Sequence, residues 1–338
     1  MTQDKSVSSQ FMPSSHYVMQ SFSRIFRASR VPFGAVVLAI LAACSIAPAE
    51  PGEPPVQRVV LVSIDGLRAD ALEHMPVLSA LRARAQWSDS MMTVVPSLTV
   101  PGHLSMFSGR DVTTLGVTTN SLDESAALTL MLNGATSIFQ WVRASGGTST
   151  AIIGGALVPV SQLATAKAFF GLDALVAAPE ATSSIVDQAL TVAVDPAAPK
   201  MLFVHLSAVD AAGHALGWID ANGALTTGYR AAAADVDTQL ARLISALDPA
   251  IAAGQVALAI TADHGGGHGN GCVAGIPAVQ EHCTAHPGDR RIPWLLVAHG
   301  VSAGRLPGQP SITQIAPTLA SLLRITRPNQ TAAPLPTT

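Results

Sequence analysis

Short, almost continuously apolar runs constrain the fold of this chain more than any other feature of its sequence. They are rich in β-branched residues, as expected for strands covered on both faces, and they span residues 58–64, 150–153, 201–206, 256–260 and 292–298. Helical periodicity lies between them, most clearly over residues 229–247 and 311–323. Strands that alternate with helices predict an α/β fold, a three-layer sandwich around a mostly parallel central sheet.

Composition supports a sizeable folded core and argues against one class of partner. Of the 338 residues, 49% are hydrophobic and 12% are charged, so the chain can bury a large apolar core and extensive disorder is not expected. The net charge of -3 gives no electrostatic reason for non-specific binding to nucleic acid. No nucleic-acid partner is therefore predicted.

The N-terminal segment has the pattern of a targeting sequence. Three arginines precede an apolar run over residues 31–43, which is too short to span a bilayer comfortably. The run ends in Leu-Ala-Ala-Cys44, which resembles the lipobox where bacterial lipoproteins are cleaved and lipidated. We therefore expect an exported protein anchored through Cys44 to a bacterial membrane, at the outer membrane facing the periplasm. An ordinary secretory signal is the alternative, and translation could start at Met12 or Met19.

Export also bears on the two remaining cysteines. Cys272 and Cys283 lie close together in a glycine-rich stretch, and an oxidising compartment favours a disulfide between them. Closing so short a loop would stabilise the fold by roughly 3 kcal/mol in the chain-entropy model. Thiolate ligation of zinc is the alternative, but the CxxC-like spacing that it needs is absent.

Acidic and histidine residues follow three of the predicted strands. Asp65 directly follows the first strand, and Asp263 and His264 follow the fourth. Asp210 follows the third strand, with His214 one helical turn later. Ligands of open α/β sheets bind beyond the carboxyl ends of the strands, so these groups are expected at one edge. Carboxylates and imidazoles from separate loops suit zinc or a similar ion, although each alone could be a plain turn or a helix-surface pair.

Thr99 is the candidate nucleophile. It opens the stretch Thr-Val-Pro-Gly-His103, just before a predicted helix that includes residues 104–107. At a helix N-terminus, backbone N–H groups would face the oxygens of a phosphate. Two cations about 3.5 to 4 Å apart could activate the hydroxyl and clamp the attacking and leaving oxygens of a displacement at phosphorus. Taken alone, Thr99 would more simply be a helix N-cap.

In this order, the motifs around Asp65, Thr99, Asp210 and Asp263 resemble the alkaline phosphatase superfamily and, within it, the type I phosphodiesterase/nucleotide pyrophosphatase branch. The resemblance covers residues 58–325. It implies a hydrolase of phosphoric ester or phosphoanhydride bonds with two divalent metal ions, expected to be Zn²⁺. By this resemblance one ion is held by Asp65, Thr99, Asp263 and His264, and the other by Asp210, His214 and a third histidine.

The resemblance places the third histidine between the Asp-His-Gly motif and the next strand. His286 is favoured, because Pro-Gly-Asp and an Ile-Pro-Trp strand follow it much as in the family. The spacing is shorter than usual in the family, so His268 and His282 stay open. His103 is expected to be a hydrogen-bonding support rather than a ligand, and His205, inside a strand, a core residue with a satisfied ring.

Asn120 is the candidate phosphate-binding side chain. Nucleotide pyrophosphatases usually carry asparagine in the third place after the nucleophile, where this chain has Gly102. Relatives with Pro-Gly-His there supply an asparagine farther along, at a distance that Asn120 matches. The stretch after the second strand lacks the Lys-x-Arg pair with which monoesterase relatives bind a dianionic phosphate. The resemblance therefore favours a small-molecule phosphate diester as the substrate.

The expected activity is hydrolysis of phosphate diesters, as a phosphodiesterase or nucleotide pyrophosphatase, through a phosphothreonine intermediate. A phosphate monoesterase or phosphonoacetate-type hydrolase on the same site is the alternative, and a non-catalytic surface lipoprotein is a further one. A sulfatase is disfavoured because no Cys-x-Pro-x-Arg or Ser-x-Pro-x-Arg element is present. The predicted organisation is a lipoprotein signal peptide, a proline-rich tether, a metal-dependent hydrolase domain and a polar tail, over residues 1–43, 44–57, 58–326 and 327–338.

Overall fold

A single eight-stranded sheet forms the centre of the folded part. The computed structural model describes residues 56–154 and 163–337. The strand order is β4-β3-β5-β1-β6-β7-β2-β8. The strands are β1 (Arg58–Ile64), β2 (Gln86–Met92), β3 (Ser149–Gly154), β4 (Ala174–Ala178), β5 (Met201–Leu206), β6 (Val256–Thr261), β7 (Arg291–Val297) and β8 (Gly304–Arg305). β1 lies parallel between β5 and β6, β3 and β4 extend the parallel part, and β7 is antiparallel to both β6 and β2.

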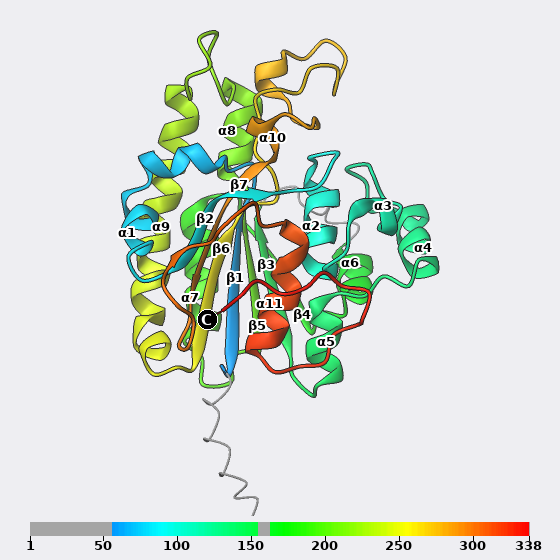
Figure 1. The fold of residues 1–338 in the computed structure, drawn as a ribbon, viewed down its shortest axis with the longest axis vertical. Helices are drawn as coiled ribbons and strands as arrows, with labels where there is room; N and C mark the ends of the chain where they lie inside the picture. The colour runs from blue at the N-terminus through cyan, green and yellow to red at the C-terminus, as the bar shows by residue number, and fades with distance from the viewer. Residues whose placement is uncertain (1–55, 155–162, 338) are drawn as a thin grey trace, which may run out of the picture. The chain divides into compact units, whose positions relative to one another are not determined.

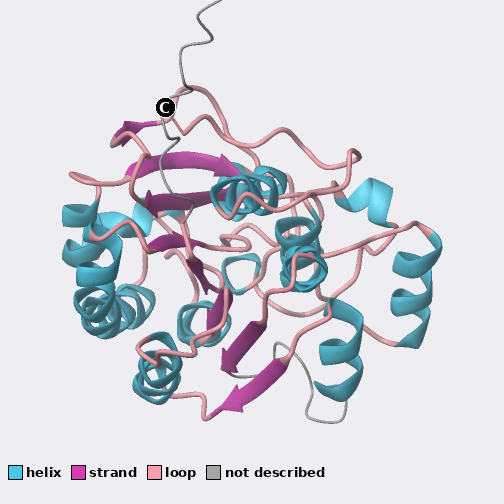
Figure 2. Cartoon of the chain, turned by 90° about the horizontal axis from the view of Figure 1, so that it is seen from below, coloured by secondary structure: helices cyan, strands magenta, loops and turns pink. Residues whose placement is uncertain are grey.

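Helices cover both faces of this sheet (Figures 1 and 2). Helices α1, α7 and α9 pack together in one layer, and α2, α5 and α11 in the other. The α-helices are α1 (Pro76–Leu81), α2 (Thr99–Ser108), α3 (Val112–Leu115), α4 (Glu124–Leu132), α5 (Ile138–Ala144), α6 (Leu163–Phe170), α7 (Thr182–Ala193), α8 (Ala208–Leu216), α9 (Thr227–Ala252), α10 (Pro287–Arg290) and α11 (Ile315–Leu322). Short 3-10 turns are η1 (Ala69–His74), η4 (Ala278–Gln280) and η5 (Ile312–Gln314). The predicted three-layer α/β sandwich is confirmed.

The apolar patterns of the sequence account for the central elements. β5 and β6 are buried along their whole length, and β1 is buried after its first residue, because helices cover both of their faces. The predicted stripe of α9 faces the core, where its members are buried: Tyr229, Ala233, Val236, Leu240, Leu243 and Leu247. The second predicted stripe begins in η5, where Ser311 and Gln314 form a capping box, and continues through α11.

Three strands were not predicted, because they lie toward the edges of the sheet. β2 contains Gln86, Ser88 and Asp89, and its burial alternates, so it forms no continuous apolar run. β4 is half-buried at one end of the strand order, and β8 is an exposed pair of residues at the other. Their pairing depends on neighbouring strands that are distant in sequence.

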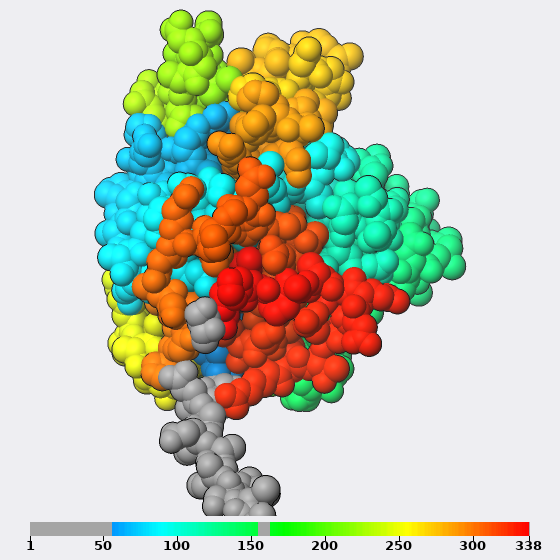
Figure 3. Space-filling model, viewed as in Figure 1, coloured from blue at the N-terminus to red at the C-terminus, as the bar shows by residue number. Residues whose placement is uncertain are grey.

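The two ends of the chain differ in how far the structure describes them. Residues 1–55, with the predicted signal peptide, Cys44 and most of the tether, lie outside the described part, so those predictions remain predictions. None of the described helices is long and apolar enough to cross a membrane. The predicted polar tail lies against the domain, where Leu335 is buried and its N–H donates to Thr318 Oγ1 at 2.8 Å. In Figure 3 this red stretch is continuous with the surface of the domain.

The loops at the carboxyl edge of the parallel strands are cross-linked. Cys272 and Cys283 form the predicted disulfide, with Cα atoms 5.9 Å apart, in the segment between β6 and β7. This segment, α8 and the start of α2 gather at the upper end of the domain in Figure 1. The carboxyl edge is therefore where the fold brings together loops that are far apart in sequence.

Candidate active site

The acidic and histidine residues predicted from strand ends lie together at this carboxyl edge. Asp65 follows β1, Asp210 and His214 belong to α8 after β5, and His264 lies just beyond β6. The described residues contain two groups of three whose ligand atoms lie within 4.8 Å of one another: Asp65, Asp210 and His264, and Asp210, His214 and His282. Asp210 is common to both groups, so the two groups form one continuous site.

His264 lies at the centre of the first group. Its Nε2 atom is 3.2 Å from Asp65 Oδ1 and 3.3 Å from Asp263 Oδ2. The hydroxyl of Thr99 is 3.0 Å from the same nitrogen. The structure thus brings together the four residues that the sequence resemblance assigned to one cation.

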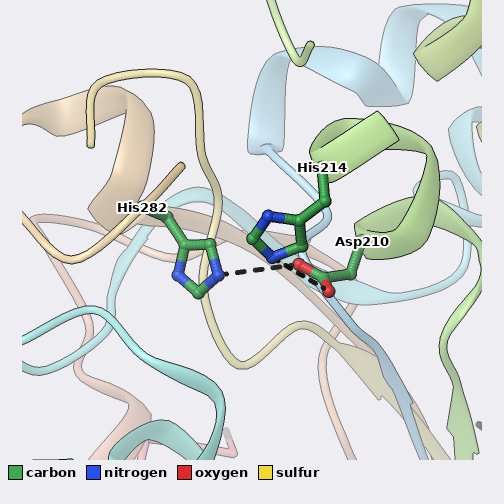
Figure 4. A group of neighbouring side chains, drawn as sticks. All are labelled: Asp210, His214 and His282. Atoms are coloured by element: carbon green, nitrogen blue, oxygen red, sulfur yellow. Dashed lines mark ion pairs between the residues drawn. The ribbon is translucent and has the colours of Figure 1, made fainter. Parts of the chain in front are cut away.

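The second group surrounds the carboxylate of Asp210. Its oxygens lie 3.5 Å from Nε2 of His214 and 3.7 Å from Nε2 of His282. Figure 4 shows both imidazoles facing this carboxylate from different parts of the chain. His214 comes from α8, and His282 comes from the segment between η4 and α10.

The same hydrogen-bond pattern orients all three imidazoles. Nδ1 of His264 lies 2.7 Å from the carbonyl oxygen of Gly265, and Nδ1 of His282 lies 2.7 Å from that of Ser97. Nδ1 of His214 lies 2.8 Å from the carbonyl oxygen of residue 280. A carbonyl oxygen can only accept, so each Nδ1 carries a proton and donates. Each ring therefore presents Nε2 to the site, the arrangement found when histidine binds a metal.

His286, the histidine favoured by the resemblance, does not lie with the second group, which instead contains His282, one of the two histidines that the sequence left open. The Nδ1 atom of His286 accepts a hydrogen bond from Gly288 N at 3.0 Å, where the residue caps α10. Its ring stacks on His268, with 3.5 Å between the ring centroids. Both rings belong to a separate pair, while the bond to Ser97 directs His282 toward Asp210.

Three carboxylate oxygens at the site are left without a hydrogen-bond donor among the described residues. They are buried and belong to Asp65 (Oδ1), Asp210 (Oδ1) and Asp263 (Oδ2). Burying a charged acceptor without a partner is costly, and a bound cation removes that cost. Carboxylate and imidazole donors with no thiolate are the ligand set of catalytic zinc and related ions. The residues present therefore fit divalent cations.

The ionisation of the site reflects this crowding of negative groups. Burial, with the neighbouring Asp65 carboxylate, raises the pKa of Asp210 to about 7. Burial also raises the pKa of Asp263 well above its usual range. Although burial opposes charge on His264, the carboxylates of Asp263 and Asp65 outweigh it and raise the pKa of His264 to about 10. Burial and the charge of His264 hold the pKa of His282 well below its usual range, which leaves Nε2 free to bind a cation.

Two buried histidines hold the candidate ligand residues in position through hydrogen bonds. His205, expected to be a core residue with a satisfied ring, is fully buried and bonds Gly154 O through Nδ1. Its Nε2 also lies 2.9 Å from Asp65 Oδ2, a positioning contact that the sequence analysis missed. His103 has its Nδ1 2.9 Å from Thr99 O and its Nε2 3.1 Å from Ser63 Oγ, as expected for a hydrogen-bonding support. His205 is a buried residue of β5, the strand that pairs with β1. That position is the feature of the sequence that could have indicated its contact with Asp65.

Thr99 is the first residue of α2, as the sequence predicted, and its side chain reaches the first group from there. Asn120 lies beside it, because Asn120 Oδ1 accepts a hydrogen bond from Val100 N at 3.0 Å. That bond leaves the amide N–H groups of Asn120 available to an oxygen held near Thr99. At Gly102 an added Cβ would lie 2.7 Å from Asp263 O, so no side chain fits at this position without a shift of the backbone.

Only glycine fits without strain at position 66, directly after Asp65, because Asp210 lies close to its backbone. Its φ is 69°, and an added Cβ would lie 2.9 Å from the Cβ of Asp210. The carbonyl oxygen of Gly66 accepts hydrogen bonds from Trp218 Nε1 and Tyr229 Oη, both at 2.9 Å. The Asp-Gly pair therefore turns the chain at the end of β1 while leaving room for the second group.

The fold is an alkaline-phosphatase-like α/β sandwich, and acids, histidines and a threonine meet at the carboxyl edge of its sheet. Residues 59–294 match the model of the type I phosphodiesterase / nucleotide pyrophosphatase family, and the chain belongs to that family. It is accordingly a hydrolase of phosphoester bonds, in a family that depends on metal ions. No curated protein matches the chain in sequence.

Solved structures with the same fold belong to proteins with several different activities. An inactive variant of murine ectonucleotide pyrophosphatase/phosphodiesterase 5 in complex with AMP has a TM-score of 0.62 and 15% identity, covering 82% of this chain and 97% of that one. The lipoteichoic acid synthase LtaP from Listeria monocytogenes has a TM-score of 0.59 and 13% identity, with coverages of 81% and 74%. A putative sulfatase from Bacteroides thetaiotaomicron has a TM-score of 0.62 and 14% identity, with coverages of 83% and 73%. At these identities the likeness shows the fold alone.

We predict that protons compete with cations for this site. Asp210, with a pKa of about 7, is mostly protonated in more acidic solution, and its proton must leave before both oxygens can bind a cation. The apparent affinity for zinc should therefore fall as the pH drops from 8 toward 5.5. Zinc titration against a competing chromophoric chelator at several pH values measures this. An affinity that is constant over that range would contradict the prediction.

Proposed function

We propose that the protein is a two-zinc phosphodiesterase or nucleotide pyrophosphatase that cleaves small phosphate diesters through a phosphothreonine intermediate on Thr99. The observation that carries this proposal is the position of the Thr99 hydroxyl, 3.0 Å from His264 Nε2. That nitrogen is in turn surrounded by carboxylates with unsatisfied oxygens. A hydroxyl in such surroundings is suited to act as an activated nucleophile.

The proposed ligand sets are those that the resemblance implies, with His282 as the third histidine, and each set overlaps one of the two groups described above. The first consists of Asp65, Thr99, Asp263 and His264, and the second of Asp210, His214 and His282. Two divalent ions bound there would lower the pKa of the Thr99 hydroxyl and offset the negative charge of the phosphate. His205 and His103 hold the first set in place through Asp65 and the backbone of Thr99.

The reaction then proceeds in two displacements at phosphorus. Thr99 Oγ1, its proton lost to solvent, bonds to phosphorus while the bond to the leaving-group oxygen breaks and that oxygen gains a proton from solvent. Water next attacks the phosphothreonine, which releases a phosphate monoester and restores the threonine hydroxyl. Asn120 donates its amide N–H to a phosphate oxygen in both steps, because its own oxygen is already bonded to Val100 N.

A diester is the favoured substrate because few positive charges face the phosphate. Among the described residues, the groups that line Thr99 are carboxylates, imidazoles and the Asn120 amide, with no lysine or arginine hydrogen-bonded to any of them. A diester carries one negative charge at phosphorus, whereas a monoester carries up to two. The murine ectonucleotide pyrophosphatase/phosphodiesterase, whose solved complex contains AMP, supports a nucleotide as one candidate substrate.

The proposed location is the periplasmic face of the outer membrane, through a lipid on Cys44. The support is the lipobox-like sequence and the proline-rich stretch that follows it. The disulfide in the domain accords with an oxidising compartment.

We predict that Thr99→Ala lowers turnover of a diester by at least about a thousandfold, since the nucleophile is lost. Bound zinc should stay close to two per chain, because six other ligands remain. The matched control is Thr238→Ala, an exposed threonine on α9 whose hydroxyl donates to Ala234 O in the same helix. Steady-state kinetics measure the turnover, and elemental analysis measures the bound zinc. Near-normal turnover in the Thr99 variant would refute the assignment of Thr99 as the nucleophile.

We predict a higher kcat/KM for bis-p-nitrophenyl phosphate than for p-nitrophenyl phosphate. The reason is the shortage of cationic side chains around Thr99. A clear preference for the monoester would instead support the alternative of a phosphate monoesterase on the same residues.

We predict that Cys44→Ala releases the protein from the membrane fraction, because the proposed lipid is attached to that thiol. Fractionation of cells that express the full chain, followed by immunoblotting, measures this. Equal membrane association of the variant and the wild type would rule out the anchor.

A further inference from the structure

We propose that Asp289, together with the Cys272–Cys283 disulfide, is a positioning device that sets the cation affinity of the Asp210–His214–His282 group. The inference rests on the two-zinc function proposed above. It assigns a role to a buried carboxylate that takes no part in either ligand set.

The carboxylate of Asp289 joins the two ends of the loop that carries His282. It is completely buried. Its Oδ1 accepts from His268 N at 3.0 Å, and its Oδ2 accepts from Thr284 N at 3.2 Å and Thr284 Oγ1 at 2.7 Å. Thr284 is two residues after His282, so one side chain fixes the start of the loop to its end.

From Thr284 the hydrogen bonds continue directly to His282. The carbonyl oxygen of Thr284 accepts from Ser97 Oγ at 2.9 Å. The carbonyl oxygen of Ser97 accepts in turn from His282 Nδ1 at 2.7 Å, the bond that turns Nε2 toward Asp210. Asp289 therefore controls the ring orientation of His282 through two intermediate residues, Thr284 and Ser97.

The backbone of Asp289 also touches the first group. Its carbonyl oxygen accepts from Gly265 N at 2.8 Å, next to His264. This bond involves no side-chain atom of Asp289, so a change of the carboxylate leaves it in place. A substitution of the side chain should consequently act on the second group and spare the first.

The disulfide is needed because little else holds the outer part of the loop. Val273 and Ile276 are exposed by 49% and 44%, and the residues between Gly269 and Ala278 are mostly exposed. Cys283 adjoins His282 and ties it to Cys272 on the far side of the loop. Segments with few buried contacts open locally at low free-energy cost, so the covalent link and Asp289 together hold His282 in place.

The hydrogen bonds of the Asp289 carboxylate suggest a variant that tests this role specifically. Asparagine has the same size, but only one of its two terminal atoms accepts hydrogen bonds. In Asp289→Asn the amide N–H₂ must face either the N–H of His268 or the donors of Thr284. One end of the loop is therefore released while the volume of the core is unchanged.

The experiment measures zinc affinity site by site in the wild type and variants, by competition with a chromophoric chelator and by elemental analysis after dialysis. In Asp289→Asn we expect the affinity of the Asp210–His214–His282 group to fall by about 10- to 100-fold, the range found when partners of metal ligands are changed. The affinity of the other ligand set should stay within about twofold of the wild-type value. Turnover should be low at limiting zinc and recover in excess zinc.

Two further variants test the same chain of contacts more gently. Thr284→Val removes the Oγ1 bond to Asp289 but keeps the backbone bonds, so a smaller fall in the same affinity is expected. The double variant Cys272→Ser/Cys283→Ser should also weaken that affinity. These variants keep the proposal testable should Asp289→Asn not fold.

The matched control is Asp237→Asn, which changes a second buried carboxylate. Unlike Asp289, Asp237 accepts its two described hydrogen bonds from backbone N–H groups. Asp237 is 2% exposed and accepts from Val77 N at 2.8 Å and Leu78 N at 2.9 Å, with no link to either ligand set. This variant should lower the melting temperature and leave both zinc affinities unchanged.

The outcomes separate the two proposals. A wild-type protein that binds no zinc, or only one ion, would contradict the two-zinc function itself. Two ions in the wild type with unchanged affinities in all loop variants would overturn the role of Asp289. Equal weakening of both affinities, without recovery of turnover in excess zinc, would also overturn it, because Asp289 would then be a general structural residue.

Discussion

Mutual repulsion among buried carboxylates is the constraint on which the rest of this structure depends. Asp65, Asp210 and Asp263 converge at one edge of the sheet, and each has an oxygen without a hydrogen-bond donor. Nearby positive charge favours the ionised form of all three, and the high pKa of His264 reflects the negative charge of the carboxylates around it. The surrounding residues therefore hold the imidazoles close to these carboxylates. His205 holds Asp65, and backbone carbonyls turn each imidazole so that Nε2 faces inward.

The sheet explains why such an unfavourable cluster can persist. The parallel strands β1, β5 and β6 are buried on both faces, and the turns at their carboxyl ends place the acids close together. Gly66 and Gly102 allow backbone contacts that any side chain would prevent. The stability of the central strands thus supports a site that is itself electrostatically strained, as is common for active sites.

The sequence predicted the parts of the site that are fixed locally by secondary structure. Asp65, Asp210 and Asp263 each come just after a largely buried strand, and the direction of a parallel strand decides which edge of the sheet they reach. Thr99 was selected for its place among the acidic motifs and just before a predicted helix, and it is the first residue of α2. His282 could not be distinguished from His286 in this way. Its position depends on a disulfide and on hydrogen bonds to Ser97, which is distant in sequence, rather than on a periodic pattern.

Asp210 belongs to both groups of neighbouring ligand atoms, so the two groups share one carboxylate. In the proposed ligand sets it would bind the second cation, and its negative charge would also act on a cation held by the first set. A change at this one side chain would therefore be expected to alter both occupancies.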